Sequence, residues 1–253
     1  MNIKTVRILG TRFAQINMED TLRAIEKFIT NGRKSQVCIT NAYSLVLMQK
    51  DTEFKDITNS ASLVVADGQP LVWISKLYGE PISERVAGPD LVYEFSRRSA
   101  KKRHKLFFLG SNSTTLKRMV ENLKELFPSL QIVGVYSPPF EKQFSERENE
   151  GMVALINKVK PDVLFVGLGV PKQERWIWEH KDELQVPVSI GVGAAFDFVA
   201  GTVKRAPKWM QKCGLEWLFR LCQEPRRLWR RYLIGNLIFL WLVLKELTRK
   251  WFN

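Results

Sequence analysis

Polar residues follow two short apolar runs of the sequence, where strands are expected to end. Thr40 and Asn41 close the run "VCITN", and Asp67 with Gly68 follows "LVVA". Hydroxyl, amide and carboxylate groups at such positions cap a helix, form a turn or contact a polar ligand. Helix capping at Asn41 and turn formation at Asp67 therefore stand beside ligand binding and general-base chemistry as interpretations.

Two kinds of group that bind anions follow other apolar runs. Arg85 in "SERVAGPDLV" precedes an expected helix, where a guanidinium either clamps a phosphate or carboxylate or lies on the surface. The stretch "VGLGVPKQERW" has glycines that let the backbone approach a ligand, and Pro171 suits the first turn of a helix whose amides favour anions. "LFFLGS" offers a similar turn. The candidate contacts from these two turns are Gly110, Ser111, Gly169, Lys172, Gln173 and Glu174.

Several catalytic motifs are absent from the sequence. It contains no Walker A motif, no HExxH, no GxSxG and no complete GxGxxG, and it has two histidines and no DxD pair. We therefore expect a reaction with no metal site and no cofactor.

The elements that must position these residues are readable as alternating strands and helices. Between the strands lie segments with helical periodicity, such as residues 111–127. This alternation predicts an α/β fold with a doubly wound, mostly parallel sheet and flanking helices, whose ligands lie at the carboxyl ends of the strands. The expected strands are Val37–Thr40, Leu63–Ala66, Leu106–Leu109, Ile132–Tyr136, Val163–Gly167 and Val188–Val192.

Charge and tryptophan concentrate in the last fifth of the chain. The whole sequence has a net charge of +13, and residues 201–253 hold 12 Lys or Arg against 3 acidic residues, with five of the eight tryptophans. The uncharged run "YLIGNLIFLWLVL" is about 20 Å long as a helix, too short for a hydrocarbon core of about 30 Å. Its Arg, Lys and Trp flanks favour a helical appendage on an anionic membrane surface. A core helix or an oligomer interface remains an alternative, whereas the apolar run argues against nucleic acid.

Cysteine use and the N-terminus bear on the compartment. Cys38, Cys213 and Cys222 show no CxxC spacing, and we expect them to be reduced and buried. The first residues lack the apolar run of a signal peptide. Together with the tail, these features predict a peripheral protein on the cytoplasmic face of the cell membrane.

The four strand ends and the tail together resemble the WecG/TagA/CpsF glycosyltransferases, family 26. The resemblance covers nearly the whole chain, through "TNAYSLV", "VVADGQPLVW", "ERVAGPDLV", "VGLGVPKQERW", "GVGAAFDFVAGTVKRAPKWM" and "GLEWLFRLCQEPRRLWRRY". It implies a Rossmann-like core over residues 1–200 and a membrane-docking helical appendage over residues 201–253. It further implies metal-independent, inverting transfer of a sugar from a UDP-sugar to a polyprenyl-diphosphate-linked saccharide, as in surface-polysaccharide or teichoic-acid-type assembly.

The resemblance also assigns roles to single residues. The family's proposed general base falls on Asp67, its pocket threonine on Thr40, and its glutamine on Gln173. The arginine after the second strand matches Arg85. In the appendage, the arginines proposed to close over the diphosphate match Arg220, Arg227 and Arg230, and we group Arg226 and Arg231 with them for lipid-diphosphate or membrane contact. The family usually reads Thr-x-Asn, whereas here Asn41 follows Thr40 directly and Ala42 takes the usual Asn place.

Three functional hypotheses follow. The first is a peripheral membrane glycosyltransferase whose donor sugar is N-acetylmannosamine, its uronic acid or glucose, with homo-oligomers possible as in similar proteins. The second is a non-catalytic sugar-nucleotide or lipid-diphosphate binding module of an export complex. The third is a Rossmann oxidoreductase, against which the incomplete glycine fingerprint counts.

Overall fold

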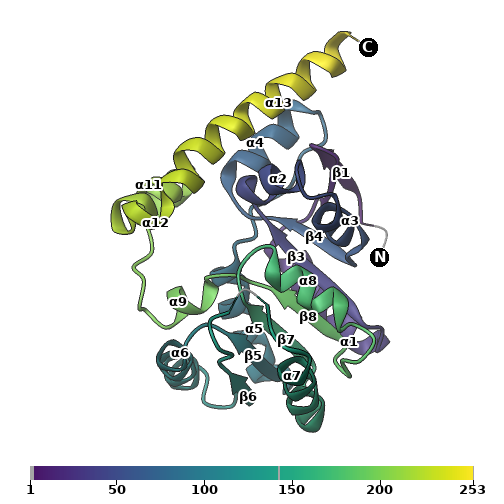
Figure 1. The fold of residues 1–253 in the computed structure, drawn as a ribbon, viewed down its shortest axis with the longest axis vertical. Coiled ribbons are helices and arrows are strands. Elements are labelled where there is room, and N and C mark those ends of the chain that lie inside the picture. Colours follow the sequence, from purple (N-terminus) through teal and green to yellow (C-terminus); the bar gives the residue numbers. More distant parts are fainter. Residues whose placement is uncertain (1–2, 142, 253) are drawn as a thin grey trace. The chain divides into compact units, whose positions relative to one another are not determined.

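The strands form one six-stranded sheet and one small hairpin in the computed structural model, which describes residues 3–141 and 143–252 (Figure 1). The order of the large sheet is β4-β3-β8-β7-β5-β6, and β3, β8, β7, β5 and β6 pair in parallel. Helices connect the strands. The predicted α/β fold with a mostly parallel sheet is therefore confirmed.

The chain divides into two compact units. Unit 1 comprises residues 1–21, 39–87 and 204–253, and unit 2 comprises residues 22–38 and 88–203. Helix α1 (Met18–Asn31) and strand β3 (Ser35–Thr40) each begin in one unit and end in the other. The expected boundary between residues 200 and 201 stays a prediction. Residues 204–253 group here with residues 1–21 and 39–87.

Unit 1 combines a hairpin, the end of β3, a second strand of the sheet with the helices around it, and the helices that follow residue 204. The hairpin turns at Leu9 and Gly10, both with positive φ (51° and 78°), which suits the tight turns that match strand twist. The sequence analysis missed this hairpin, because Thr and Arg interrupt its two strands, "TVRI" and "TRFA", so neither forms an apolar run. The elements are β1 (Thr5–Ile8), β2 (Thr11–Ala14), α2 (Ala42–Met48), α3 (Thr52–Ser60), β4 (Leu63–Ala66), α4 (Gln69–Leu77), α10 (Lys208–Lys212), α11 (Glu216–Gln223), α12 (Pro225–Trp229), the π-helical turn η1 (Arg230–Ile234) and α13 (Gly235–Phe252).

Unit 2 holds the other strands with helices on both faces. Successive residues of a strand point to opposite faces, and β5 shows the consequence. Phe107 lies in an apolar cluster with side chains of α7 and α8, whereas Phe108 stacks on Phe165 of β7 and meets Phe196 of α9 edge-on. The elements are α5 (Gly88–Lys102), β5 (Lys105–Gly110), α6 (Ser113–Leu126), β6 (Gln131–Tyr136), α7 (Glu146–Val159), β7 (Val163–Gly167), α8 (Lys172–Glu179), β8 (Val188–Gly191) and α9 (Ala195–Val199).

Helix α13 packs against unit 1 through one face. Phe239 and Val243 are buried, and the helix contacts α2 (Figure 1). Glu246 fixes the C-terminal half of α13, because one of its carboxylate oxygens accepts hydrogen bonds from Leu9 N (2.9 Å) and Tyr78 Oη (2.6 Å). The opposite face of α13, together with the end of η1, exposes apolar side chains, namely Leu233, Ile234, Leu237, Leu240, Trp241 and Leu244. The alternative of a fully buried core helix is therefore excluded for this segment.

The six predicted strands are confirmed, with ends shifted by two residues at most. The expectation for the cysteines is wrong in part. Cys38 is buried on β3, but Cys213 and Cys222 are exposed. The two exposed residues lie in the C-terminal helical segment, whose apolar side chains partly face outward, so an apolar neighbourhood in the sequence did not mean burial there.

Candidate active site

The backbone of unit 1 brings three of the predicted site residues together. Asp67 N donates a hydrogen bond to Thr40 O (2.8 Å), so the ends of β3 and β4 lie side by side. Val86 N donates to Ala66 O (2.9 Å), which places Arg85 on the segment next to the end of β4. Thr40, Asp67 and Arg85 therefore stand on three neighbouring backbone segments.

Gly68 makes the sharp change of direction that follows Asp67. Its φ of 116° and ψ of 133° lie in a region that side chains other than hydrogen rarely allow. Helix α4 begins at the next residue, and within the described residues no side chain caps its first turn. The partial positive charge of this helix start favours anions, and Asp67 stands two residues before Gln69, the first residue of α4.

Asn41 is the N-cap of α2. Its Oδ1 accepts hydrogen bonds from Ser44 N (3.0 Å) and Ser44 Oγ (3.3 Å). The capping interpretation that the sequence left open is thus what the structure shows. A ligand contact by Asn41 stays a prediction.

Arg85 is held by residues near the C-terminus. Its Nη1 lies 2.6 Å from Glu216 Oε2, and its Nη2 donates to Gln211 Oε1 (3.1 Å). Glu216 also accepts from Arg205 Nε through its other oxygen (3.1 Å). The Arg85 side chain is 13% exposed and that of Glu216 22%, so this ion pair is largely shielded from solvent.

The arginines of the C-terminal segment differ in their contacts. Glu224 lies between Arg220 (3.7 Å) and Arg227 (2.5 Å), and the Arg230 guanidinium lies 5.2 Å from the centre of the Trp229 ring. The Arg231 guanidinium lies over the ring of Tyr43 (4.8 Å), in the first turn of α2. The structure therefore brings Arg231 close to the end of β3. Arg226 is exposed on α12.

The predicted glycine turns of unit 2 follow β5 and β7. Gly110 has a φ of 120°, and a Cβ there would lie 2.4 Å from Gly167 O, so neither the angle nor the space allows a side chain. Ser111 N donates to Gly167 O (3.3 Å), which joins the ends of the two strands. Gly169 also has a positive φ, of 82°. These turns stand at the carboxyl ends of parallel strands, where α/β sheets bind ligands.

Lys172 and Gln173 are engaged within unit 2. Lys172 Nζ donates to Glu141 O (2.6 Å) and lies over the Phe144 ring. Gln173 is 1% exposed, and its amide donates to Glu174 Oε1 (2.8 Å) and accepts from Gly193 N (2.9 Å). Gln173 thus connects the start of α8 to the turn after β8, in place of the open presentation that the sequence suggested.

Glu174 is a buried carboxyl group, 3% exposed. Burial raises its pKa to about 7, because the charged form loses its hydration, and the hydrogen bond from Gln173 opposes this rise. Its Oε2 has no hydrogen-bond partner among the described residues. Glu174 is therefore placed to hold Gln173, and direct contact with a substrate stays a prediction.

Sequence reasoning missed three polar residues around these strand ends. Glu216 and Gln211 contact Arg85, and Asp197 at the start of α9 accepts a hydrogen bond from Ser111 Oγ (3.3 Å). Glu216 and Asp197 stand in stretches that carry the family resemblance, "GLEWLFR" and "GAAFDFV". Nothing in those stretches states which distant residue each one meets, so the signal marked the segments without giving the contacts.

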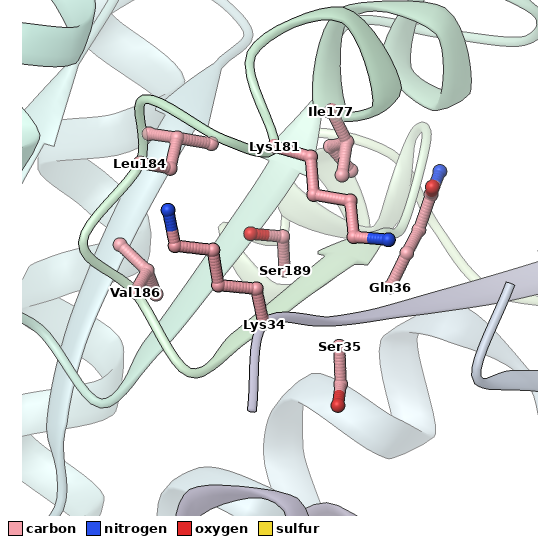
Figure 2. Close-up of a pocket in the computed structure, with 8 residues that line it drawn as sticks. All are labelled: Lys34, Ser35, Gln36, Ile177, Lys181, Leu184, Val186 and Ser189. Carbon is pink, nitrogen blue, oxygen red and sulfur yellow. The ribbon is translucent and has the colours of Figure 1, made fainter. Parts of the chain in front are cut away.

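A small pocket lies in unit 2 at the amino-terminal ends of the strands (Figure 2). Its lining comes from the amino ends of β3 and β8 and from the end of α8 and the loop after it. Lys34 Nζ donates to Asp182 O (2.5 Å), and Lys181 Nζ lies over the Trp178 ring. The pocket lies at the amino ends of β3 and β8, and the glycine turns of unit 2 lie at the carboxyl ends of β5 and β7. Its lining residues are Lys34, Ser35, Gln36, Ile177, Lys181, Leu184, Val186 and Ser189.

Residues 3–141 and 143–252 hold neither a cluster of metal ligands nor a membrane-spanning helix. No group of three or more His, Cys, Asp and Glu side chains there is arranged to hold a metal ion. In the same part of the chain, no helix has the length and apolar character needed to cross a membrane.

Comparison with known proteins decides the family. Residues 6–253 match the glycosyl transferase WecG/TagA/CpsF family. The chain belongs to this family. It is a glycosyltransferase, as the resemblance implied, and the binding module and the oxidoreductase lose their support.

Three curated relatives carry the same enzyme name, N-acetylglucosaminyldiphosphoundecaprenol N-acetyl-beta-D-mannosaminyltransferase. The relative from Bacillus subtilis (strain 168) is 33% identical over 252 residues, which cover 99% of this chain and 95% of that protein. The one from Staphylococcus aureus (strain MW2) is 29% identical over 90% of this chain and 89% of its own length. The one from Bacillus spizizenii is 34% identical over 73% of this chain and 69% of its own.

Proposed function

We propose that this glycosyltransferase moves N-acetylmannosamine from UDP-N-acetylmannosamine to the N-acetylglucosamine of a polyprenyl-diphosphate-linked acceptor, in surface-polysaccharide or teichoic-acid-type synthesis. The observation that carries the proposal is the match along 99% of this chain to a relative named for that transfer. Of the three donor sugars that the sequence left open, the relatives' shared name favours N-acetylmannosamine.

Asp67 is the proposed general base. In a direct displacement, the acceptor hydroxyl oxygen bonds to the anomeric carbon of the sugar, the bond from that carbon to UDP breaks, and the hydroxyl proton passes to the Asp67 carboxylate. One displacement inverts the configuration, so an α-linked UDP-sugar gives a β-linked product, which agrees with the "beta" in the relatives' name. Thr40, joined to Asp67 through the backbone, is proposed to contact the substrate beside the base.

The departing UDP carries negative charge, and cationic groups that meet it lower the barrier. We propose that Arg85 and arginines of the C-terminal segment supply this charge without a metal ion. Arg231 is supported by its position over Tyr43, two residues after Asn41. The uncapped start of α4 beside Asp67 adds backbone amides that favour an anion.

Membrane contact is assigned to α13 and the arginines before it. The outward face of α13 holds exposed leucines, with Leu237 69% exposed, and it includes Trp241. Arg226, Arg227 and Arg230 precede this helix in the chain. An apolar helix face with adjoining cationic and tryptophan side chains is the pattern of a helix that lies in the interface of an anionic leaflet. We propose a peripheral enzyme on the cytoplasmic face of the cell membrane.

A donor panel tests the proposal. The full chain is incubated with UDP-N-acetylmannosamine, UDP-N-acetylmannosaminuronic acid or UDP-glucose and a short-chain prenyl-diphosphate-linked N-acetylglucosamine. UDP release and product mass are then measured. We expect acceptor-dependent release to be fastest with UDP-N-acetylmannosamine. Preference for another donor contradicts the sugar assignment, and no acceptor-dependent release with any of the three contradicts the proposed reaction.

A further inference from the structure

We infer that Glu216 is a positioning residue for Arg85, and that the α10–α11 corner, residues 205–216, serves to orient this arginine at the end of β4. The inference rests on the proposed function, in which Arg85 contacts the diphosphate of the substrate. It divides the C-terminal segment into a first part that orients Arg85 and a last helix, α13, that meets the membrane.

Glu216 holds two arginines with one carboxylate. Its Oε2 lies 2.6 Å from Arg85 Nη1, and its Oε1 accepts from Arg205 Nε at 3.1 Å. Hydrogen bonds between a guanidinium and a carboxylate are short and directional, so they fix the plane of the guanidinium as well as its place. Two guanidinium groups from different parts of unit 1 therefore share one carboxylate.

Gln211 fixes Arg85 from a second direction. Its side chain is buried, and its amide nitrogen donates to Ala206 O (2.7 Å) while its amide oxygen accepts from Arg85 Nη2 (3.1 Å). Since Ala206 O can only accept, the amide must turn its oxygen to Arg85. Two different acceptors from the corner therefore hold the two terminal nitrogens of Arg85.

The corner itself is fixed against α4, the helix that begins after Asp67 and Gly68. Gly214 has a φ of 69°, and a Cβ there would lie 2.8 Å from the Trp73 ring and 3.3 Å from Gln69 Cβ. The backbone of the corner thus lies directly on α4. One short segment contacts both the helix that follows the proposed base and the arginine proposed to bind the leaving group.

This arrangement suits a preorganised cation. A long arginine side chain loses much rotational freedom when it is fixed, and a site that fixes it before the substrate binds avoids that cost in the reaction. Glu216 and Gln211 fix the two terminal nitrogens of Arg85 before any substrate binds.

Hydrogen–deuterium exchange tests the positioning without any substrate. The full chain is compared with Glu216→Gln and with the milder Glu216→Asp, which keeps the charge on a shorter side chain. We expect faster exchange in the peptide that spans residues 83–88 in Glu216→Gln and a smaller increase in Glu216→Asp. Glu125→Gln, which neutralises an exposed glutamate on α6, is the matched control and should leave this peptide unchanged. Equal exchange in all four proteins overturns the inference.

Kinetics test whether Glu216 acts through Arg85. Sugar transfer is measured for Glu216→Gln, Arg85→Lys and the double variant, with vesicle binding measured in parallel. We expect Glu216→Gln to lower kcat at least tenfold with unchanged vesicle binding, and to cause little further loss in the Arg85→Lys background. An equal loss in both backgrounds, or a normal rate, overturns the inference. If the wild-type chain transfers no sugar, the proposed function fails, and the exchange experiment still decides the positioning.

Discussion

The carboxylate of Glu216 lies 2.6 Å from a guanidinium nitrogen of Arg85, although the two residues stand 131 positions apart in the chain. The pair joins the C-terminal helices to the segment beside Asp67, within one compact unit. Removing residues 204–253 would therefore take away partners of Arg85 and uncover apolar contacts of α13. Point variants separate catalysis, membrane contact and folding more cleanly than a truncation.

Asp67→Asn is expected to lower sugar transfer at least 100-fold, because asparagine has the shape of the carboxylate but does not take the acceptor proton. The free energy of unfolding and the affinity for UDP should stay close to those of the wild-type chain. Transfer rates, urea unfolding and UDP titration measure the three quantities.

Asp56→Asn is the matched control for that variant. Asp56 is an exposed aspartate of the same unit, on α3, so the substitution has the same chemistry at a position away from the strand ends. It should leave transfer unchanged. Wild-type turnover in Asp67→Asn would remove Asp67 from the role of base.

Gly68→Ala is expected to destabilise the protein by ~1–3 kcal/mol and to lower transfer, because alanine at a φ of 116° is strained. The cost comes from the backbone and not from crowding, since the nearest atom to an added Cβ is Pro70 Cδ at 3.8 Å.

Gly151→Ala is the control substitution for Gly68→Ala. Gly151 lies within α7 with nothing near its missing Cβ, so alanine should stabilise by about 0.5–1 kcal/mol. Denaturant unfolding checks both, and equal effects would contradict the backbone argument.

Glu174 should make the stability of the protein depend on pH. Its pKa is about 7 in the folded chain against an ordinary value of 4.5. The folded state therefore keeps a proton that the unfolded state has lost between these values. The stabilisation is complete below about pH 4.5 and is lost as the pH rises to about 7. At ~1.4 kcal/mol per tenfold change, the loss is on the order of 3 kcal/mol.

Glu174→Gln removes this dependence, because an amide does not ionise in that range. Urea unfolding of both proteins at pH 5, 6, 7 and 8 gives the comparison. Relative to the wild-type chain, the variant should gain free energy of unfolding from pH 5 to pH 7 and then level off. Glu125→Gln, on the surface of the same unit, serves as the control. A difference between Glu174→Gln and wild type that stays constant with pH would rule out a raised pKa at Glu174.

The outward face of α13 is expected to carry vesicle binding. Replacing Leu237, Leu240 and Leu244 together by glutamine removes three exposed apolar side chains and leaves the buried Phe239 and Val243 in place. Binding to vesicles that contain phosphatidylglycerol should weaken at least about tenfold. Transfer to a short-chain, water-soluble acceptor should persist.

Leu126→Gln on α6, another exposed leucine, is the control for that triple variant, and co-sedimentation with vesicles measures both. If the triple variant binds vesicles as tightly as the wild-type chain, another surface docks on the membrane.

The sheet and the strand-end residues were largely predictable from the sequence. Buried parallel strands read as short apolar runs, and Leu63–Ala66 and Val163–Gly167 have the same ends in the sequence and in the structure. The residues directly after these runs had to lie near the carboxyl edge of a parallel sheet. Asp67 and Gly110 could therefore be chosen as candidates before any contact was known.

Only the tertiary structure determined which distant segments of the chain contact each other. Apolar periodicity states which face of an element is buried but not which partner covers it, so Glu216 and Gln211 could not be assigned to Arg85. For the same reason, Gln173 and Glu174 were expected at an open edge, whereas the fold buries both beneath the turn after β8. The run "YLIGNLIFLWLVL" indicated an apolar helix, and the packing of Phe239 and Val243 on unit 1 determined which side of that helix is left facing outward.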